Sequence, residues 1–180
     1  QDGVRVVEVL NDFEQDASGR YKLPSLQAGS PLEIVVRLHV PATESGTKVH
    51  LADFDLSYIG QNSKLPERAT AKLEAEFASA EVVESLAENG QVTKAVLLLM
   101  NARARREAVE YIDRQDIAGA RSSLAMAMDA TNAMFSRAPS PELQKELEDL
   151  AGVDQALDMD DMLARKLGLY QRYNRRTGKD

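Results

Sequence analysis

The side chains best suited to acid–base or metal chemistry are few in this sequence. Two of the 180 residues are histidines, His39 and His50, and none is cysteine. A histidine pair on neighbouring strands can bind a metal or transfer a proton. The sequence supplies no third ligand beside them, and His39 falls on the outward face of its expected strand. We therefore interpret both histidines as structural. The lack of cysteine excludes disulfides, thiol catalysis and cysteine-ligated metals.

Two acidic segments contain closely spaced carboxylates, as metal-binding sites do. Asp53-Phe54-Asp55-Leu56-Ser57 matches the first oxygen ligands of an EF-hand loop, but Tyr58 takes the glycine position and Lys64 the final glutamate position. A strand facing solvent explains this segment better. Asp158-Met159-Asp160-Asp161 is expected on a helix, where its carboxylates point in different directions. The sequence thus predicts no metal site, no cofactor and no catalytic residue, and we expect a protein that is not an enzyme.

Two groups of basic residues are candidate binding sites for an acidic partner or phosphate. Arg103, Arg105 and Arg106 form the first group; ordinary pairs with Glu107 and Glu110, four residues after Arg103 and Arg106, are the simpler explanation. The second group is a C-terminal basic tail, for which we expect either electrostatic docking or, more simply, a frayed end. Its members are Arg172, Arg175, Arg176 and Lys179.

Composition narrows the class of partner. The net charge is −7, and neither the part before residue 79 nor the part after it is basic. This argues against a nucleic-acid surface, which needs a surplus of Lys and Arg. The longest apolar run, residues 95–100, is far shorter than the ~20 residues that span a bilayer. No signal assigns a compartment, and a cytoplasmic location is weakly favoured. Because the chain begins with Gln1, we expect a segment of a longer protein.

Apolar residues alternate in the first part of the chain. This period of two predicts strands at residues 4–10, 21–26, 32–40, 49–59 and 69–77. In the fourth strand Phe54 and Leu56 share one face and Asp53 and Asp55 the other. We therefore predict an N-terminal antiparallel β-sandwich-like unit at residues 1–78. Five strands are few for a sandwich, so we expect strands before Gln1 to complete the sheet. Without them one edge is unpaired, and a homodimer of the segment is expected through that edge or through the helical hairpin.

Helical spacing replaces the alternation near residue 79. Helices are predicted at residues 80–88, stopping at Asn89-Gly90, and at 91–114, after 116, at 140–152 and at 154–174. Leu124 lies mid-stripe in the third of these and should be core. The last helix has an expected buried stripe. Its members are Ala156, Met159, Leu163, Leu167 and Tyr170. The chain is thus predicted to be α+β, with a C-terminal helical hairpin or bundle at residues 79–180.

Several segments resemble the region that follows the von Willebrand factor type A domain in bacterial proteins labelled calcium-activated-chloride-channel-like. They are Leu26-Gln27-Ala28-Gly29, residues 32–36, residues 51–58, residues 101–108 and residues 116–124. The metal-ion-dependent adhesion motif of that domain, Asp-x-Ser-x-Ser, is absent, since Asp55-Leu56-Ser57-Tyr58-Ile59 lacks the second serine. The resemblance implies that the domain and its metal lie upstream.

The resemblance further implies a non-catalytic protein-interaction or structural module. Its partner would be another protein, with the upstream von Willebrand factor type A domain as one candidate. The alternative is a small-molecule or carbohydrate-binding β-sandwich. Such sites commonly use exposed aromatic side chains, and the absence of Trp counts against this alternative.

Overall fold

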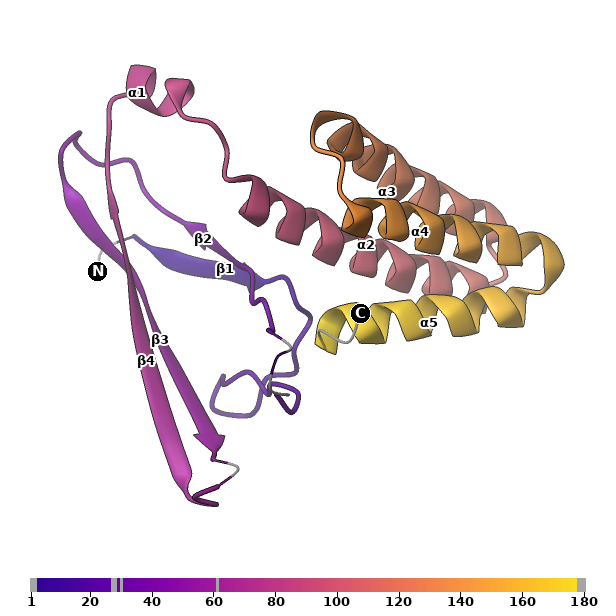
Figure 1. Cartoon of the computed structure of the whole chain (residues 1–180), viewed down its shortest axis with the longest axis horizontal. Coiled ribbons are helices and arrows are strands. Elements are labelled where there is room, and N and C mark those ends of the chain that lie inside the picture. Colours follow the sequence, from indigo (N-terminus) through magenta and orange to yellow (C-terminus); the bar gives the residue numbers. More distant parts are fainter. Residues whose placement is uncertain (1–2, 27–28, 30, 61, 178–180) are drawn as a thin grey trace. The chain divides into compact units, whose positions relative to one another are not determined.

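The computed structural model describes residues 3–26, 29, 31–60 and 62–177 (Figure 1). Gln27, Ala28 and Lys179, to which parts of the sequence interpretation refer, lie outside these residues. Within these ranges, four strands precede five helices. The strands form two two-stranded sheets, β1–β2 and β3–β4. The predicted α+β class is confirmed, and the described strands do not close into a sandwich.

The chain forms two compact units. The first comprises Gln1–Glu8 and Val36–Glu88, and the second comprises Val9–Val35 and Asn89–Asp180. The first unit therefore holds the sheets and the short helix α1 (Ala80–Ser85), whereas the second holds the four long helices. The segment from Val9 to Val35 belongs with the helices, although it lies among the strands in sequence.

The first unit is dominated by one long hairpin. Strands β3 (Lys48–Ile59) and β4 (Pro66–Glu76) pair antiparallel along their whole length. The register shifts between His50 and Ala52, which marks a bulge in β3. The predicted strands at 49–59 and 69–77 match this hairpin closely. The strand predicted at 4–10 is β1 (Arg5–Val9), which pairs with β2 (Val36–His39).

One strand prediction was wrong and another was too long. Residues 21–26 contain no extended strand, only an isolated bridge from Tyr21 to Gln15. The strand predicted at 32–40 begins only at Val36. Before Val36, the side chain of Asn11 takes the place of a neighbouring strand in hydrogen bonding to the backbone. The Asn11 amide donates to the Glu33 carbonyl at 2.7 Å and accepts from the Val35 N–H at 2.9 Å. A side chain that bonds to the backbone in this way competes with sheet pairing.

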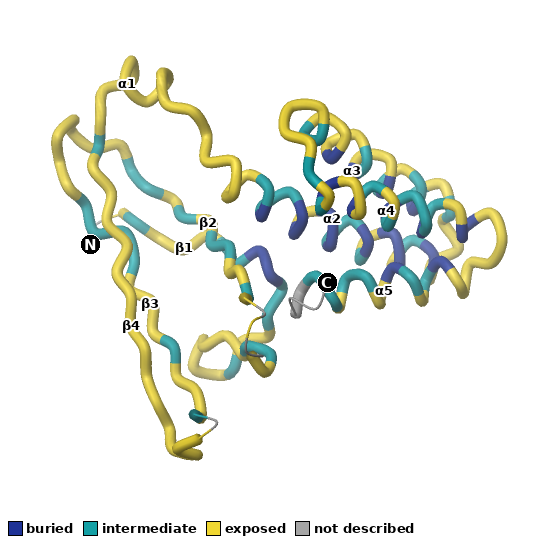
Figure 2. Tube along the Cα trace, in the orientation of Figure 1, coloured by how far each residue is buried: buried dark blue, intermediate teal, exposed yellow. Residues whose placement is uncertain are grey.

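The second unit is a four-helix bundle. Its members are α2 (Gly90–Asp113), α3 (Ile117–Arg137), α4 (Pro141–Met159) and α5 (Asp161–Thr177). Each helix packs on two others, in the cyclic order α2, α3, α4, α5. The buried faces of the helices line the centre of the bundle (Figure 2). Leu124, with 0% of its surface exposed, confirms its predicted place in this core.

The predicted boundary between the last two helices was wrong. Gly152 lies inside α4, since the surrounding core residues Leu150 and Val153 hold the helix together there. A glycine in a helix costs only about 1 kcal/mol, which core packing overrides. The break falls at Asp160, whose extended backbone ends α4 and whose carboxylate accepts from the Met162 N–H at 2.8 Å. Asp160 therefore caps α5, and the acidic run does not lie on one helix.

The stripe predicted for the last helix was also wrong in part. Met159 is 80% exposed, and Leu163 and Tyr170 are exposed as well. The helix turns Ala164 and Gly168 to the core instead. A Cβ atom at Gly168 would lie 3.1 Å from Cγ2 of Val109, so the glycine permits close approach of α5 to α2.

The end of α1 also differs from the prediction. This helix ends at Ser85, and Asn89 caps the start of α2 by accepting from the N–H groups of Gln91 and Val92.

Candidate protein-interaction surface

The β3–β4 hairpin separates apolar and charged side chains onto opposite faces. Residues directly opposite each other in an antiparallel pair share a face, and the register places Phe54 opposite Ala71 and Leu56 opposite Ala69. The alternation in the sequence predicted these faces, and the register confirms them. We define the apolar face by the residues that share it. They are Val49, Ala52, Phe54, Leu56, Tyr58, Ala69, Ala71, Leu73 and Ala75.

Much of this apolar face is open to solvent. Phe54 is 41% exposed, Tyr58 42% and Leu73 41%. Every residue of β4 is exposed, and the hairpin contributes no residue to the buried core (Figure 2). An exposed contiguous apolar patch commonly marks a contact site for another molecule. The apolar face is therefore the strongest candidate for an interaction surface among the described residues.

The opposite face carries charges, some of which are already paired. Arg68 forms a two-pronged ion pair with Asp55 across the strands. Nε2 of His50 lies 2.9 Å from a carboxylate oxygen of Asp53. Lys72 and Glu74, in contrast, form no ion pair with any described residue. Both side chains lie on the charged face of β4. The edge of β4 that faces away from β3 pairs with no third strand in the described part of the chain.

The residues singled out for metal chemistry do not come together. His39 lies exposed on β2 and His50 on β3, in different sheets. Asp53 and Asp55 each bind a basic side chain rather than converging on one point. Within the described residues no three His, Asp or Glu side chains gather as a metal site.

One carboxylate near the hairpin turn interacts with two hydroxyl groups. The Ser63 hydroxyl donates to Oε1 of Glu67 at 2.6 Å, and the Tyr58 hydroxyl also bonds to this carboxylate. These two hydrogen bonds hold the pKa of Glu67 below its ordinary value. The same bond, with the nearby negative charge, raises the pKa of Tyr58.

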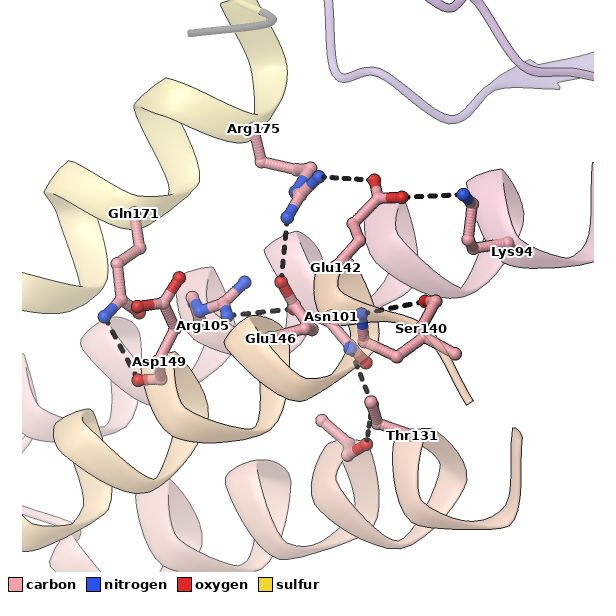
Figure 3. Close-up of polar contacts among 12 residues, drawn as sticks. Lys94, Asn101, Arg105, Thr131, Ser140, Glu142, Glu146, Asp149, Gln171 and Arg175 are labelled. Atoms are coloured by element: carbon pink, nitrogen blue, oxygen red, sulfur yellow. Dashed lines mark hydrogen bonds and ion pairs between the residues drawn. The ribbon is translucent and has the colours of Figure 1, made fainter. Parts of the chain in front are cut away.

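The helical unit buries an ion-pair network that the sequence interpretation missed (Figure 3). Arg105 on α2 and Glu146 on α4 are each 1% exposed, with Nη2 of Arg105 2.9 Å from Oε1 of Glu146. Arg175 on α5 donates to Oε2 of Glu146 at 3.1 Å. Glu142 connects the network to Lys94, whose Nζ lies 2.6 Å away. This network joins three helices of the bundle.

A second ionic cluster fixes the segment after β1 to the helices. Asp12 accepts from Nη1 of Arg106 at 2.7 Å, lies 3.4 Å from Arg103, and lies 3.9 Å from Arg172. Arg103 also reaches the Val9 carbonyl at 3.3 Å. The three arginines that were candidates for an external anion are thus engaged within the unit: Arg105 in the network and the other two at Asp12. Of the expected pairs with following glutamates, Arg106–Glu110 is present at 3.7 Å.

The basic C-terminal residues are ordered rather than frayed where the structure describes them. Arg172 and Arg175 lie on α5 and bind Asp12 and the network respectively. Their docking is intramolecular. Nothing is described of the Arg176 side chain or of Lys179.

A cavity of about 240 Å³ lies in the helical unit. Leu32, Leu98 and Leu99 supply apolar wall, and Lys94, Glu142 and Arg175 supply the charged part. Glu142 lies 2.6 Å from Lys94 and 3.5 Å from Arg175, so it already interacts with both cations. The cavity is therefore a weaker candidate for a binding site than the apolar face of the hairpin.

None of the described helices has a stretch long and apolar enough to span a bilayer. Comparison with models of known protein families, with characterised proteins and with solved structures found no match.

Proposed function

We propose that this chain is a non-catalytic protein-interaction module, and that the apolar face of the β3–β4 hairpin is its contact surface. The observation that carries the proposal is the exposure of Phe54, Tyr58 and Leu73 on one face of a long hairpin. An isolated two-stranded hairpin is marginally stable in water, and a third strand or a packed layer normally supports it. A partner that covers the face would supply that layer.

The chemistry of the face favours a β-sheet as the partner. Sheets that pack face to face lie about 10 Å apart and interdigitate apolar side chains from both layers. The small side chains of Ala69, Ala71 and Ala75 lie opposite larger apolar side chains of β3, which suits such packing. Partner strands over this face would complete the sandwich that the sequence predicts. The resemblance described above makes an upstream von Willebrand factor type A domain, or strands associated with it, the favoured source of those strands.

The first test uses the coding sequence upstream of Gln1 and the polypeptide that it encodes. An Asp-x-Ser-x-Ser motif is expected there, and its absence would overturn the assignment to that domain. The upstream segment is then produced separately, and its binding to this chain is measured by calorimetry. Phe54→Asp places a charge in the apolar face and should weaken binding roughly tenfold or more, as loss of a central contact does.

A matched control introduces the same aspartate on the charged face of the hairpin in place of the apolar face. Ser57→Asp lies on the same hairpin but on the charged face, opposite Arg68. It should bind nearly as well as the unchanged chain. Equal weakening by both variants would show that the apolar face has no special role, and no binding by the unchanged chain would refute this partner.

A carbohydrate or small-molecule site is the second candidate, because Phe54 and Tyr58 are exposed aromatic side chains on one flat face. Sugars also need polar groups that converge beside the aromatic surface. Glu67, opposite Tyr58, is one such group, but it already bonds to the Ser63 hydroxyl, and the neighbours opposite Phe54 and Leu56 are alanines. We therefore rank protein binding first. A thermal-shift screen with oligosaccharides separates the two, since a ligand of the native state raises the melting temperature.

A further inference from the structure

The outer edge of β4 is the second unpartnered feature of the hairpin. Phe77 donates its N–H to the Thr47 carbonyl at 2.9 Å and accepts from the Gly46 N–H at 2.7 Å, so its backbone points toward β3. Successive residues of a strand point their backbone groups to opposite sides. The N–H and C=O groups of Thr70, Lys72, Glu74 and Glu76 therefore point away from β3. The bulge lies in β3 and does not change this alternation in β4.

We propose that β4 pairs antiparallel with β4 of a second copy of this chain, with Leu73 opposite its own symmetry mate. A two-fold axis at Leu73 makes the interface the same patch on both copies. It also sets each Lys72 opposite the Glu74 of the other copy. This inference concerns the edge of the hairpin and does not depend on what covers its apolar face.

Charge complementarity selects this occupant and this register. Lys72 and Glu74 have no ion-pair partner among the described residues, and the symmetric pairing gives both of them one. Opposite charges across neighbouring strands attract, while like charges repel. A register centred on Ala71 would instead place Glu74 opposite Arg68, which Asp55 already engages. Charged side chains at a sheet edge usually prevent pairing with another strand. In β4, however, the positive Lys72 and the negative Glu74 lie on either side of Leu73, so two antiparallel copies bring opposite charges together.

The apolar side of the paired edges is also compatible. With Leu73 on the axis, Leu73 meets Leu73 and Ala71 meets Ala75 on the apolar face. No charged side chain of that face is brought opposite another between Ala71 and Ala75. The two hairpins then form a four-stranded sheet, and three or more strands with an apolar face are more stable than two.

Charge reversal tests the proposal. The dissociation constant of the dimer is measured by sedimentation or light scattering over a concentration series. Lys72→Glu and Glu74→Lys should each weaken the dimer roughly 10- to 100-fold, because each turns two attractive pairs into two repulsive ones. The double variant Lys72→Glu/Glu74→Lys should restore the original value. A constant mass near 19.8 kDa, or a double variant as weak as the single ones, would overturn the proposal.

Crosslinking tests the register independently, because the chain has no native cysteine. Leu73→Cys should form a disulfide-linked dimer on mild oxidation, since opposed residues of a non-hydrogen-bonded pair bring their Cβ atoms close enough. Ala71→Cys is the matched control and should crosslink much less; the reverse result would overturn the Leu73 register. Phe54→Asp should leave the dimer intact, which separates failure of this proposal from failure of the proposed function.

Discussion

Replacing Glu146 by methionine should destabilise the helical unit more than replacing its partner Arg105. Both side chains are 1% exposed, so each needs a counter-charge. Glu146→Met leaves the buried guanidinium of Arg105 without one, and breaking a buried pair in this way costs about 3–5 kcal/mol. Arg105→Met leaves Glu146 with its 3.1 Å contact to Arg175. We expect the smaller loss of about 1–3 kcal/mol for this variant.

The double variant Arg105→Met/Glu146→Met should be more stable than Glu146→Met alone. It removes both charges, and replacing a buried pair by apolar residues is often neutral or stabilising. Its free energy of unfolding should return to within about 1 kcal/mol of the original. Urea unfolding followed by far-UV circular dichroism gives these free energies. Arg121→Met, which removes the solvent-accessible ion pairs of Arg121 with Asp154 and Asp158, is the control and should cost less than about 1 kcal/mol. Equal losses in both single variants, or a larger loss for Arg105→Met, would refute the reasoning.

Three further predictions concern single residues. Leu124→Ala should cost about 2–5 kcal/mol, because it empties a fully buried position; an unchanged urea midpoint would contradict this. Asn89→Ala should cost about 0.5–2 kcal/mol and Asn89→Gly only a few tenths, because Asn89 caps α2; equal losses would argue against the cap. The lowered pKa of Glu67 means that its stabilising effect is present above its ordinary pKa of 4.5 and is lost as the pH falls through the folded value. NMR titration should find the Tyr58 pKa above 10, and Glu67→Gln should lower it.

The sequence predicted the hairpin well because one physical rule governs it. Side chains alternate along a strand, so the order of apolar and charged residues reveals the two faces. Phe54 and Leu73 were placed on the apolar sides of their strands, where the register shows them. The core of the bundle followed in the same way from helical spacing, as Leu124 shows. Local periodicity was sufficient in both cases.

Local periodicity could not predict the buried ion-pair network. Arg105 and Glu146 lie far apart in sequence, and each on its own looks like a solvated residue of a helix. Only the assembled bundle, in which α2 and α4 each pack on α3 and α5, shows that both side chains are enclosed. The same holds for Asn11, whose amide ends a sheet ladder through residues more than twenty positions away. Interactions set by tertiary packing leave no local periodic signal.

Periodicity also shows which residues form the apolar face of a strand or helix, but it does not show whether another part of the chain packs on that face. The alternation of β3 and β4 is as regular as the spacing of α3, yet Leu124 is fully buried while Phe54 and Leu73 are not. The helices find their apolar partners within the unit that they form, whereas the described residues supply no second layer for the hairpin. The apolar face and the outer edge of β4 point in different directions. One partner can therefore lie over the face while a second copy pairs at the edge, and the Phe54 and Lys72 variants address the two surfaces separately.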